Sequence, residues 1–408
     1  MTRNRLLILI AIVVLAGGYF FYTRTNGSQS PQTKSNTFTG TQPTTALSPA
    51  PTDGMSPKQQ ELFDKYKLGT IKLPAGFRIS VFAEVPTARS LAVSPSGVVY
   101  VGNRSNSSVY AVVDDNRDGV ADHMHEVAKG MHVPNGVAFK DGDLYIMTIS
   151  TLYKVAGVER DLTNPSQPEV VYDKFPADEA HGWKYMAFGP DGALYIPVGV
   201  PCNSCENSNE LFGTVARFDL NTKQVSIVAR GVRNSVGFDW KPGTGELWFT
   251  DNGRDLMGDD LPGDELNRVT QVGQSFGAPF CYADGVQDSD LPKRNCADFT
   301  APVAVLAPHT AALGMKFYTG SMFPEQYKNQ IFIAEHGSWN RSTPIGYRVM
   351  MVRLDGDRAV SYEPFIDGWL DQNGQSNGRP VDIAVLADGS MLVSDDKAGA
   401  IYRISYSQ

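Results

Sequence analysis

The sequence is short of basic side chains, and this limits what the protein can bind. It has 36 lysines and arginines against 44 aspartates and glutamates in 408 residues, which gives a formal net charge of −8. Binding to nucleic acid through the phosphate backbone requires a basic surface. We therefore expect no nucleic-acid partner.

Long stretches with apolar residues every three to four positions are also absent, which argues against a helical fold. Glycine (39 residues) and proline (25 residues) are frequent instead. Many short strands joined by tight turns produce this combination. The composition therefore predicts an all-β protein, and its 42% of hydrophobic residues are enough for a large core.

Only one long hydrophobic run occurs, at the N-terminus. Arg3 and Arg5 precede the apolar stretch 6–22, and Arg24 follows it. Basic residues before an apolar segment are typical of a signal peptide or an uncleaved membrane anchor, with the rest of the chain outside the cytoplasm. The run ends in bulky aromatic residues, lacks a small-residue cleavage site and has no cysteine for lipid attachment. These features favour an anchor within residues 1–25.

The segment that follows lacks large apolar residues. Residues 26–56 are rich in Ser, Thr, Pro, Gln and Gly. Such a segment buries too little apolar surface to offset the entropy of ordering it. We predict a disordered linker over residues 26–56 that joins the membrane to an exported domain spanning residues 57–408.

Cysteine is scarce, with four residues in the chain. Cys202 and Cys205 lie in a Cys-Asn-Ser-Cys sequence, and Cys281 and Cys296 lie fifteen positions apart. In an exported protein an even number suggests local disulfides, here Cys202–Cys205 and Cys281–Cys296. A thioredoxin-like redox pair would need a strand–helix context that is absent, and a four-cysteine zinc site is the remaining alternative.

A pattern that occurs six times predicts the architecture of the domain. Each copy has a short strand, a turn with Gly or Asp-Gly, and a second apolar strand. The copies start at Arg89, Asn135, Lys184, Asn234, Leu313 and Val381. The first four starts are 46, 49 and 50 residues apart, the length of one four-stranded propeller blade, and the last two intervals leave room for insertions.

These repeats indicate a six-bladed β-propeller. One such sheet cannot bury both its faces, whereas six sheets around an axis bury them and leave only short edges. A two-sheet sandwich would not need six similar hairpins. The strand candidate at residues 72–82 precedes the first copy, so we expect it to complete the last blade and close the ring.

Polar residues at the copy boundaries are the candidates for function, because they lie where a propeller opens its central channel. His181, His309 and His336 are at such boundaries. A neutral imidazole suits a general base, and a loop histidine bonded to a backbone carbonyl is an equal alternative. Arg233 and Asn234 open the fourth copy, and an arginine fork suits a carboxylate or a quinone oxygen.

An acidic, glycine-containing loop follows the fourth copy. Residues 251–265 contain three glycines and six acids, the last of which is Glu265. Calcium takes six to eight oxygen ligands, backbone carbonyls among them, so this loop is a candidate calcium site, with a solvated acidic loop as the alternative. Residues 114–119 begin like a calcium loop, but His125 stands where its closing glutamate belongs, which favours a hairpin turn.

Several runs, taken in order, resemble the soluble pyrroloquinoline-quinone sugar dehydrogenases, particularly their sorbosone dehydrogenase-like and pyranose dehydrogenase-like branch. The runs are HGWKYMAFGPDGALYIPVG from His181, ARGVRNSVGFDWKPGTGELWFTDNGRD from Ala229, DDLPGDELNRV from Asp259, IFIAEHGSWNRSTPIGYRV from Ile331 and GRPVDIAVLADGSMLVSDD from Gly378. The resemblance covers nearly the whole domain. It implies a propeller that oxidises an aldose, sorbosone or a related sugar alcohol or aldehyde, with the quinone and Ca²⁺ as cofactors.

The resemblance also implies roles for individual residues. His181 matches the catalytic base, and Arg233 matches the arginine beside the reactive quinone carbonyls, with Asn234 after it. Gly253 and Arg254 match positions whose backbone carbonyls hold the cofactor calcium. A separate position, Arg379, matches an arginine that pairs with a cofactor carboxylate.

Other positions match the family less closely. Asn135 has a matching cofactor-binding place in the second copy. The family's cofactor lysine has no equivalent in the fifth copy, where His336 or Arg341 are candidates for that cationic role. Glu265 and Asp284 match a second, structural calcium site of the glucose-oxidising members. The substrate loops differ from those members, so the resemblance does not imply glucose itself.

Two other functions compete with this interpretation. A calcium-dependent propeller lactonase would need a metal on the channel axis held by carboxylates from several blades, whereas the acids here cluster in one loop. A non-enzymatic binding propeller leaves the boundary positions of His181, Arg233 and Arg379 unexplained. Since the chain has no Cys-x-x-Cys-His haem motif, a dehydrogenase would pass its electrons to a separate acceptor.

Overall fold

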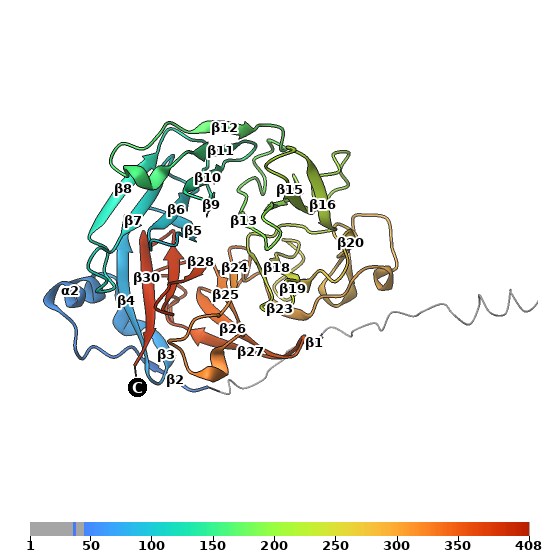
Figure 1. The fold of residues 1–408 in the computed structure, drawn as a ribbon. Helices are drawn as coiled ribbons and strands as arrows, with labels where there is room; N and C mark the ends of the chain where they lie inside the picture. Colours follow the sequence, from blue (N-terminus) through green and yellow to red (C-terminus); the bar gives the residue numbers. More distant parts are fainter. Residues whose placement is uncertain (1–35, 38–44, 408) are drawn as a thin grey trace, which may run out of the picture. The chain divides into compact units, whose positions relative to one another are not determined.

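The structure, a computed structural model, describes residues 36–37 and 45–407. These residues form six sheets of four or five strands, arranged as blades around one axis (Figure 1). The prediction of an all-β, six-bladed propeller is confirmed. The predicted anchor, residues 1–25, lies outside the described residues. Within the described ranges, no helix has both the length and the apolar character needed to cross a membrane.

The blades follow the chain order of the six predicted copies. Blade 1 consists of β5 (Ala88–Val93), β6 (Val99–Asn103), β7 (Val109–Val113) and β8 (His123–Ala128), and blade 2 of β9 (Gly136–Lys140), β10 (Asp143–Met147), β11 (Leu152–Val155) and β12 (Glu169–Tyr172). Blade 5 consists of β24 (Ala312–Phe317), β25 (Ile331–Glu335), β26 (Arg348–Asp355) and β27 (Arg358–Ile366). Every predicted copy therefore supplies the first two strands of a blade.

Blades 3 and 4 each gain a fifth, parallel strand at the outer edge. Blade 3 consists of β13 (Ala187–Phe188), β14 (Leu194–Val198), β15 (Thr214–Phe218), β16 (Val225–Arg230) and β20 (Gln274–Ser275). Blade 4 consists of β17 (Phe238–Trp240), β18 (Leu247–Asp251), β19 (Gly263–Arg268), β23 (Ala304–Pro308) and β1 (Asn36–Thr37). The extra strands cover edges that would otherwise expose unpaired backbone groups.

Strands from both ends of the described domain close the ring. Blade 6 consists of β28 (Pro380–Val385), β29 (Met391–Asp395), β30 (Ala400–Tyr406) and β4 (Phe77–Glu84). β4 and β30 are antiparallel, with Ile79 opposite Ile404. The prediction that residues 72–82 complete the last blade is confirmed for β4.

The last part of the predicted linker takes regular structure. β2 (Leu47–Pro49) pairs with β3 (Lys72–Pro74), and the Ala50 N–H donates to the Ile71 carbonyl at 2.9 Å. Strand pairing uses backbone groups that every residue carries, so a composition poor in apolar side chains does not exclude it. The helix α2 (Pro57–Lys65) follows, and Ser56 and Gln59 form a capping box at its N-terminus.

The remaining short elements lie in the connections between strands. They are η1 (Leu68–Thr70), η2 (Val158–Arg160), β21 (Cys281–Tyr282), η3 (Ala283–Gly285), β22 (Val286–Gln287), η4 (Cys296–Asp298) and η5 (Glu325–Tyr327). Both predicted disulfides, Cys202–Cys205 and Cys281–Cys296, are present in these connections.

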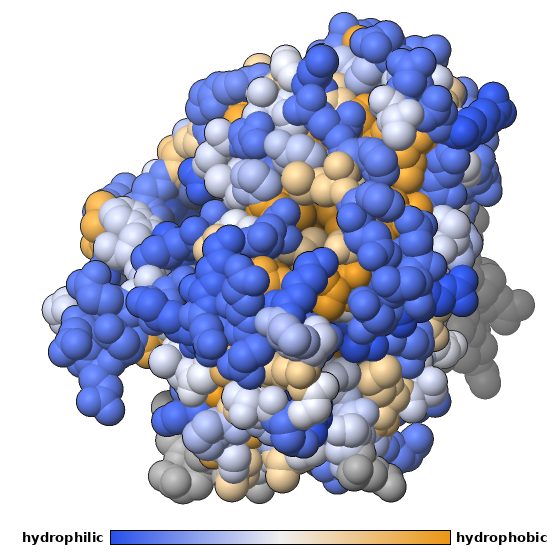
Figure 2. Space-filling view, turned by 90° about the vertical axis from the view of Figure 1, so that its left-hand side faces the viewer, coloured by the Kyte–Doolittle hydropathy of each residue, from blue (hydrophilic) through white to orange (hydrophobic). Residues whose placement is uncertain are grey.

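Apolar residues fill the spaces between neighbouring blades. Phe77 of β4 packs edge to face against Phe323 and Phe365 of blade 5, with ring centroids 4.7 and 4.9 Å apart. Tyr185 and Phe238 make a similar contact between blades 3 and 4 at 4.9 Å. The outer face in Figure 2 is largely hydrophilic, and apolar residues show mainly in its hollows. Side-chain packing therefore joins each of these blades to its neighbour.

Antiparallel pairing brings particular loops to one rim of the channel. In blade 1 the start of β5 pairs with the end of β6, and in blades 5 and 6 the starts of β24 and β28 likewise pair with the ends of β25 and β29. Residues just before each first strand and just after each second strand therefore meet at the same end. The candidate residues that come from these positions are His181, Arg233, Asn234, Gly253, His336 and Arg379.

Candidate active site

A cavity of about 410 Å³ opens at this rim. Residues of five blades line it, and all but Asp264 of β19 come from the first or second strand of a blade or from the segments beside those strands. The lining includes six predicted residues, His181, Arg233, Asn234, Gly253, His336 and Arg379. It also includes His309, so the three boundary histidines share one cavity. Its volume lies in the range that small ligands and cofactors need, about 300–1,000 Å³.

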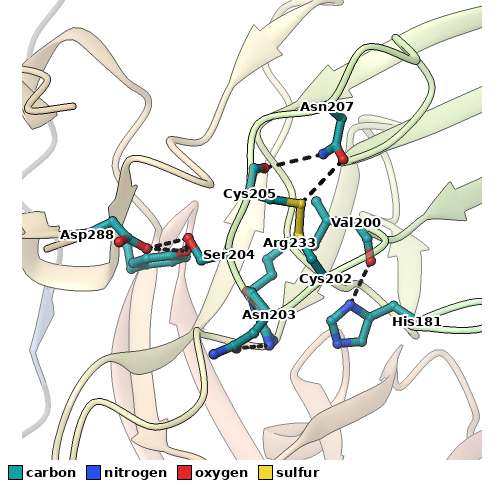
Figure 3. The surroundings of a disulfide bond; sticks show 10 residues. His181, Val200, Cys202, Asn203, Ser204, Cys205, Asn207, Arg233 and Asp288 are labelled. Atoms are coloured by element: carbon teal, nitrogen blue, oxygen red, sulfur yellow. Dashed lines mark hydrogen bonds between the residues drawn. A yellow bond between two sulfur atoms is a disulfide. The ribbon is translucent and has the colours of Figure 1, made fainter. Parts of the chain in front are cut away.

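His181 is held just ahead of β13 by a hydrogen bond from its ring (Figure 3). Its Nδ1 lies 2.9 Å from the carbonyl oxygen of Val200. Because a carbonyl oxygen only accepts, Nδ1 carries the proton, and Nε2 of the neutral ring keeps its lone pair. His181 has a φ of 50°, and Gly199 makes room for it, since a Cβ on Gly199 would lie 2.6 Å from that of His181. This arrangement suits a general base.

The surroundings of His181 keep the ring neutral. Burial lowers the pKa of His181 to about 4, and the charge of Arg233 lowers it further than Asp255 raises it. A histidine with this pKa is deprotonated throughout the physiological range. The expected alternative, a histidine bonded to a backbone carbonyl, is therefore also correct, because the same bond prepares Nε2 to accept a proton.

Arg233 is buried beside His181 and is firmly held, with 2% of its surface exposed. Its Nε donates to the Asn203 carbonyl and its Nη2 donates to Asn203 Oδ1 and Asp255 Oδ2, each at 2.8 Å. Its Nη1 donates to the Asn252 carbonyl at 3.2 Å. These bonds use four of the five guanidinium N–H groups, so the charge lies in one fixed orientation.

Arg379 lies across the cavity, before β28. Its Nε and Nη2 donate to the carbonyls of His336 and Gly337 at 2.9 and 2.7 Å. Among the described residues no carboxylate contacts its guanidinium; its main-chain N–H donates to Asp395 Oδ1 at 2.9 Å. A guanidinium bound only to neutral carbonyls keeps its full positive charge in the cavity, which favours an anionic ligand.

His336 belongs to an ion-pair network at the same side. Its Nε2 lies 2.8 Å from Asp396 Oδ1, and Arg89 Nη1 contacts the other oxygen of Asp396 at 2.6 Å. Burial lowers the pKa of His336 to about 4 despite this carboxylate. His336 is therefore neutral near pH 7, and Arg89 rather than His336 carries the positive charge here.

Arg104 and Trp183 line the cavity, and neither was expected to do so from the sequence. The Arg104 guanidinium lies 3.7 Å from the centroid of the Trp183 ring. In the described part of the chain Arg104 has no hydrogen-bond partner. Cation–π contact leaves its N–H groups free at the ring edge. Together with Arg379, it gives the cavity two cations that no carboxylate neutralises.

Gly253 and Arg254, the candidate calcium ligands, follow β18. The Gly253 N–H donates to Asp264 Oδ1 at 2.9 Å, and no N–H or O–H of the described residues donates to the Gly253 carbonyl. The Arg254 side chain points to a salt bridge with Asp288 at 2.5 Å. Next to them, Asn252 Oδ1 is buried without a hydrogen-bond partner among the described residues. An orphaned buried oxygen beside a free carbonyl suits an oxygen-seeking cation.

The structure supports the second pair of candidate calcium ligands, Glu265 and Asp284, less well than the first. Glu265 is buried on β19 directly opposite Asp251 of β18, whereas Asp284 is in the surface turn η3. Burial raises the pKa of Glu265, and the charge of Asp251 adds to that effect. Within the described ranges no three His, Cys, Asp or Glu side chains form a metal-binding group. A structural calcium at Glu265 and Asp284 stays a prediction.

Asn135 and Arg341 do not line the cavity. Asn135 is fully buried and accepts from Arg89 Nε at 2.8 Å while its amide donates to the Lys184 carbonyl at 3.1 Å. It acts on the cavity through Arg89. The Arg341 guanidinium donates to the Asp259 carbonyl and to the Asp260 carboxylate of the acidic loop. These bonds keep its charge at the rim.

The lining residues missed from the sequence had a recognisable signal. Arg89 starts the first copy, and Arg233 and Arg379 lie one and two residues before the fourth and sixth copies, so all three stand at copy boundaries. Arg104 follows the second strand of blade 1, as Gly253 follows that of blade 4. A search for charged residues at every copy boundary would have identified both arginines. Asn203 had no such signal, because it belongs to an irregular loop.

A second cavity, about 400 Å³, lies between blades 2 and 3, where the β9–β10 turn and the β13–β14 turn line it together with Arg217 of β15. Its arginine, Arg217, is paired with Asp191 at 2.6 Å. Its lining contains no histidine. The axial cavity is therefore the candidate active site.

Comparison with other proteins places this cavity in a known family. A sequence model described as "Glucose / Sorbosone dehydrogenase" matches residues 149–403, more than half of the chain. An uncharacterized protein of Borreliella burgdorferi is 32% identical over 357 residues, 83% of this chain and 92% of its own length. A pyrroloquinoline quinone-dependent pyranose dehydrogenase of Coprinopsis cinerea is 32% identical over 127 residues, 26% of this chain and 17% of that protein.

Solved structures share the fold at low sequence identity. The holo pyranose dehydrogenase PQQ domain of Coprinopsis cinerea has a TM-score of 0.69 at 18% identity, covering 82% of this chain and 97% of its own. The PQQ-bound aldose sugar dehydrogenase of Streptomyces coelicolor has a TM-score of 0.60 at 18% identity, covering 82% and 100%. The matched range 149–403 contains His181, Arg233 and Arg379, which meet in one cavity. From its sequence, and with the fold in agreement, the chain belongs to the glucose/sorbosone dehydrogenase family.

Proposed function

We propose that the chain oxidises a sugar, an aldose, sorbosone or a related alcohol or aldehyde, with pyrroloquinoline quinone bound in the axial cavity. The observation that carries this proposal is the meeting of a neutral, oriented imidazole with fixed guanidinium groups in one cavity. The chain's family and its fold neighbours, two of which have the quinone in their names, support the choice of cofactor.

The residues present fit a planar, polyanionic cofactor. Arg379 and Arg104 offer two cations without carboxylate partners, and the quinone carries carboxylates that such cations bind. Bound there, the quinone would supply a two-electron acceptor. Gly253 and Asn252 offer oxygens to a calcium ion, which we propose as the second cofactor on the strength of the orphaned Asn252 Oδ1.

The chain's own side chains would then have separate roles in the reaction. His181 Nε2 would accept the proton of the substrate hydroxyl while the carbon that bears this hydroxyl gives up its hydride to the electron acceptor. Arg233, held in a buried site, would stabilise negative charge that develops near it, with no cost of reorganisation. Trp339, 67% exposed at the cavity, offers an apolar face to a sugar ring. Electrons would leave to an external acceptor.

We further propose that the domain works outside the cytoplasm, joined to a membrane by its N-terminal segment. The two disulfides support an oxidising compartment. Fractionation of cells that express the chain with and without residues 1–25 tests this: the full chain should sediment with membranes and be open to added protease.

Reconstitution tests the enzymatic proposal. Purified protein with calcium and the quinone should reduce an electron-accepting dye in the presence of aldoses or sorbosone, without nicotinamide. Calorimetry on the same preparation should show quinone binding that is tighter with calcium than with a chelator. A preparation that neither binds the quinone nor oxidises any sugar or alcohol in a broad panel would overturn the proposal in favour of a binding propeller.

A further inference from the structure

The loop closed by Cys202–Cys205 lies against the buried arginine of the cavity (Figure 3). It belongs to the connection between β14 and β15, where residues 199–213 form no helix or strand. Its first contact is made by Val200, whose N–H donates to the Arg233 carbonyl at 3.0 Å and whose carbonyl receives His181 Nδ1. One irregular segment thus touches both proposed catalytic residues.

Asn203, inside the disulfide ring, makes the densest set of these contacts. Its carbonyl and its Oδ1 each accept from the Arg233 guanidinium at 2.8 Å. Its Oδ1 also accepts from the Asp255 N–H, and its Nδ2 donates to the Asp255 carbonyl, both at 3.0 Å. Asn203 therefore provides two of the four bonds that orient Arg233 and fixes the backbone of Asp255, which provides a third.

The other end of the ring is anchored by the second disulfide loop. Ser204 Oγ donates to Asp288 and also receives the Tyr282 hydroxyl at 3.3 Å. Tyr282 and Asp288 both lie between Cys281 and Cys296, which are joined. The two disulfides therefore restrain one continuous set of contacts that ends at Arg233.

We infer that Asn203 is a positioning residue for Arg233, and that the Cys202–Cys205 disulfide keeps it in place. The four-residue ring takes the place of strand pairing in a segment that has none. The inference rests on the proposed function for the role of Arg233, but the contacts themselves do not depend on it. An oxidised loop is then a condition for an ordered cavity.

Asn203→Ala in the full-length protein tests the inference, with Asn207→Ala as its matched control. Asn207 is in the same loop but contacts Cys205 rather than Arg233. We expect Asn203→Ala to lower kcat/KM of the reconstituted enzyme by about tenfold to a hundredfold, the scale of a misplaced catalytic group. Asn207→Ala should stay within about twofold of the wild type.

A second measurement does not need the quinone. The groups whose charge acts on His181 are Arg233, Arg104 and Asp255, so a displaced Arg233 guanidinium would raise the His181 titration midpoint. NMR of histidine-labelled apo protein measures this, with His181→Gln to assign the signal. An unchanged midpoint together with unchanged kcat/KM in Asn203→Ala would overturn the inference. If the protein proves not to bind the quinone, the midpoint still decides whether Asn203 positions Arg233.

The disulfide is tested by Cys202→Ser/Cys205→Ser, which also serves if Asn203→Ala fails to fold. This variant should shift the His181 midpoint in the same direction. The variant that carries all three substitutions should lose less kcat/KM than the product of the losses in Asn203→Ala and in Cys202→Ser/Cys205→Ser, because both changes act through one set of contacts. Fully multiplicative effects would show that the disulfide does not act through Asn203.

Discussion

At the scale of single residues, the active-site proposal depends on the state of one imidazole. The hydrogen bond from Nδ1 to Val200 leaves Nε2 as the acceptor, and burial beside Arg233 keeps the ring neutral. His181→Gln should therefore lower kcat by about 10²–10⁴-fold, the usual contribution of a general base. Quinone affinity by calorimetry should stay near the wild-type value. A variant that keeps full turnover would remove His181 from this role.

The same environment predicts an unusual pH dependence. The pKa of His181 is lowered to about 4, so the base form persists far below pH 6.5 and is lost only as the pH falls through about 4. The acid limb of kcat/KM should consequently lie near pH 4 in steady-state assays at saturating quinone. The residual activity of His181→Gln should lack that limb. An acid limb near pH 6.5 would mean that His181 is neither as buried nor as close to Arg233 as described.

The sequence predicted some site residues and missed others for a physical reason. His181, Arg233 and His336 were predicted because they stand at copy boundaries, and Arg379 was predicted from the family resemblance; antiparallel pairing brings all four to one rim. Arg341 was a candidate through the resemblance alone, as a substitute for the family's cofactor lysine, but the structure pairs it with the Asp260 carboxylate and not with the cavity. The asparagines and aspartates that orient these cations come from irregular loops, whose course depends on tertiary contacts.

At the scale of elements, the ring is stabilised by the strand that joins its two ends. Ile79 of β4 is 1% exposed and faces the core of blade 6. Ile79→Ala should lower the free energy of unfolding by about 2–5 kcal/mol, because it leaves a cavity at the closure. Denaturant titration measures the change. Ser80→Ala, the next residue on the same strand, should change it by less than about 0.5 kcal/mol, and equal effects would contradict the role of closure packing.

Elements were more predictable than their surroundings. Two-residue turns such as Asp141-Gly142, with φ of 53° and 88°, were predicted because that backbone favours Asp and Gly. β2 was not predicted, since its pairing with β3 requires no side-chain pattern. The parallel edge strands β1 and β20 were missed on the same grounds.

At the scale of the whole molecule, buried carboxyl groups give the stability a pH dependence. Burial raises the pKa of Asp251 and of Glu265, which lie opposite each other, and the charge of Asp251 raises that of Glu265 further. The native state therefore holds protons that the unfolded chain, with pKa values near 4, releases. Their stabilising contribution is present below pH 4 and is lost as the pH rises through the native pKa values.

The buried histidines and Lys184 oppose this loss of stability, but only at pH values outside a window between about 6.5 and 8. His181 and His336, with pKa lowered to about 4, make stability rise with pH only up to the unfolded value near 6.5. Burial lowers the pKa of Lys184 to about 8, so Lys184 makes stability rise with pH only above about pH 8. Between pH 6.5 and 8 the free energy of unfolding should therefore fall, by up to about 1.4 kcal/mol per pH unit for each proton released.

Urea titrations at half-unit pH steps, with a chelator present so that no cation binds the carboxylates, measure this slope. Glu265→Gln keeps the shape of the side chain and its contact with Asn267 but removes the titrating proton, so its slope in the window should be reduced. Glu61→Gln, on the exposed face of α2, is the matched control and should leave the slope unchanged. A wild-type stability that rises between pH 6.5 and 8 would mean that the Asp251–Glu265 pair is ionised in the native protein, and hence that a cation or solvent reaches the interior of blade 4.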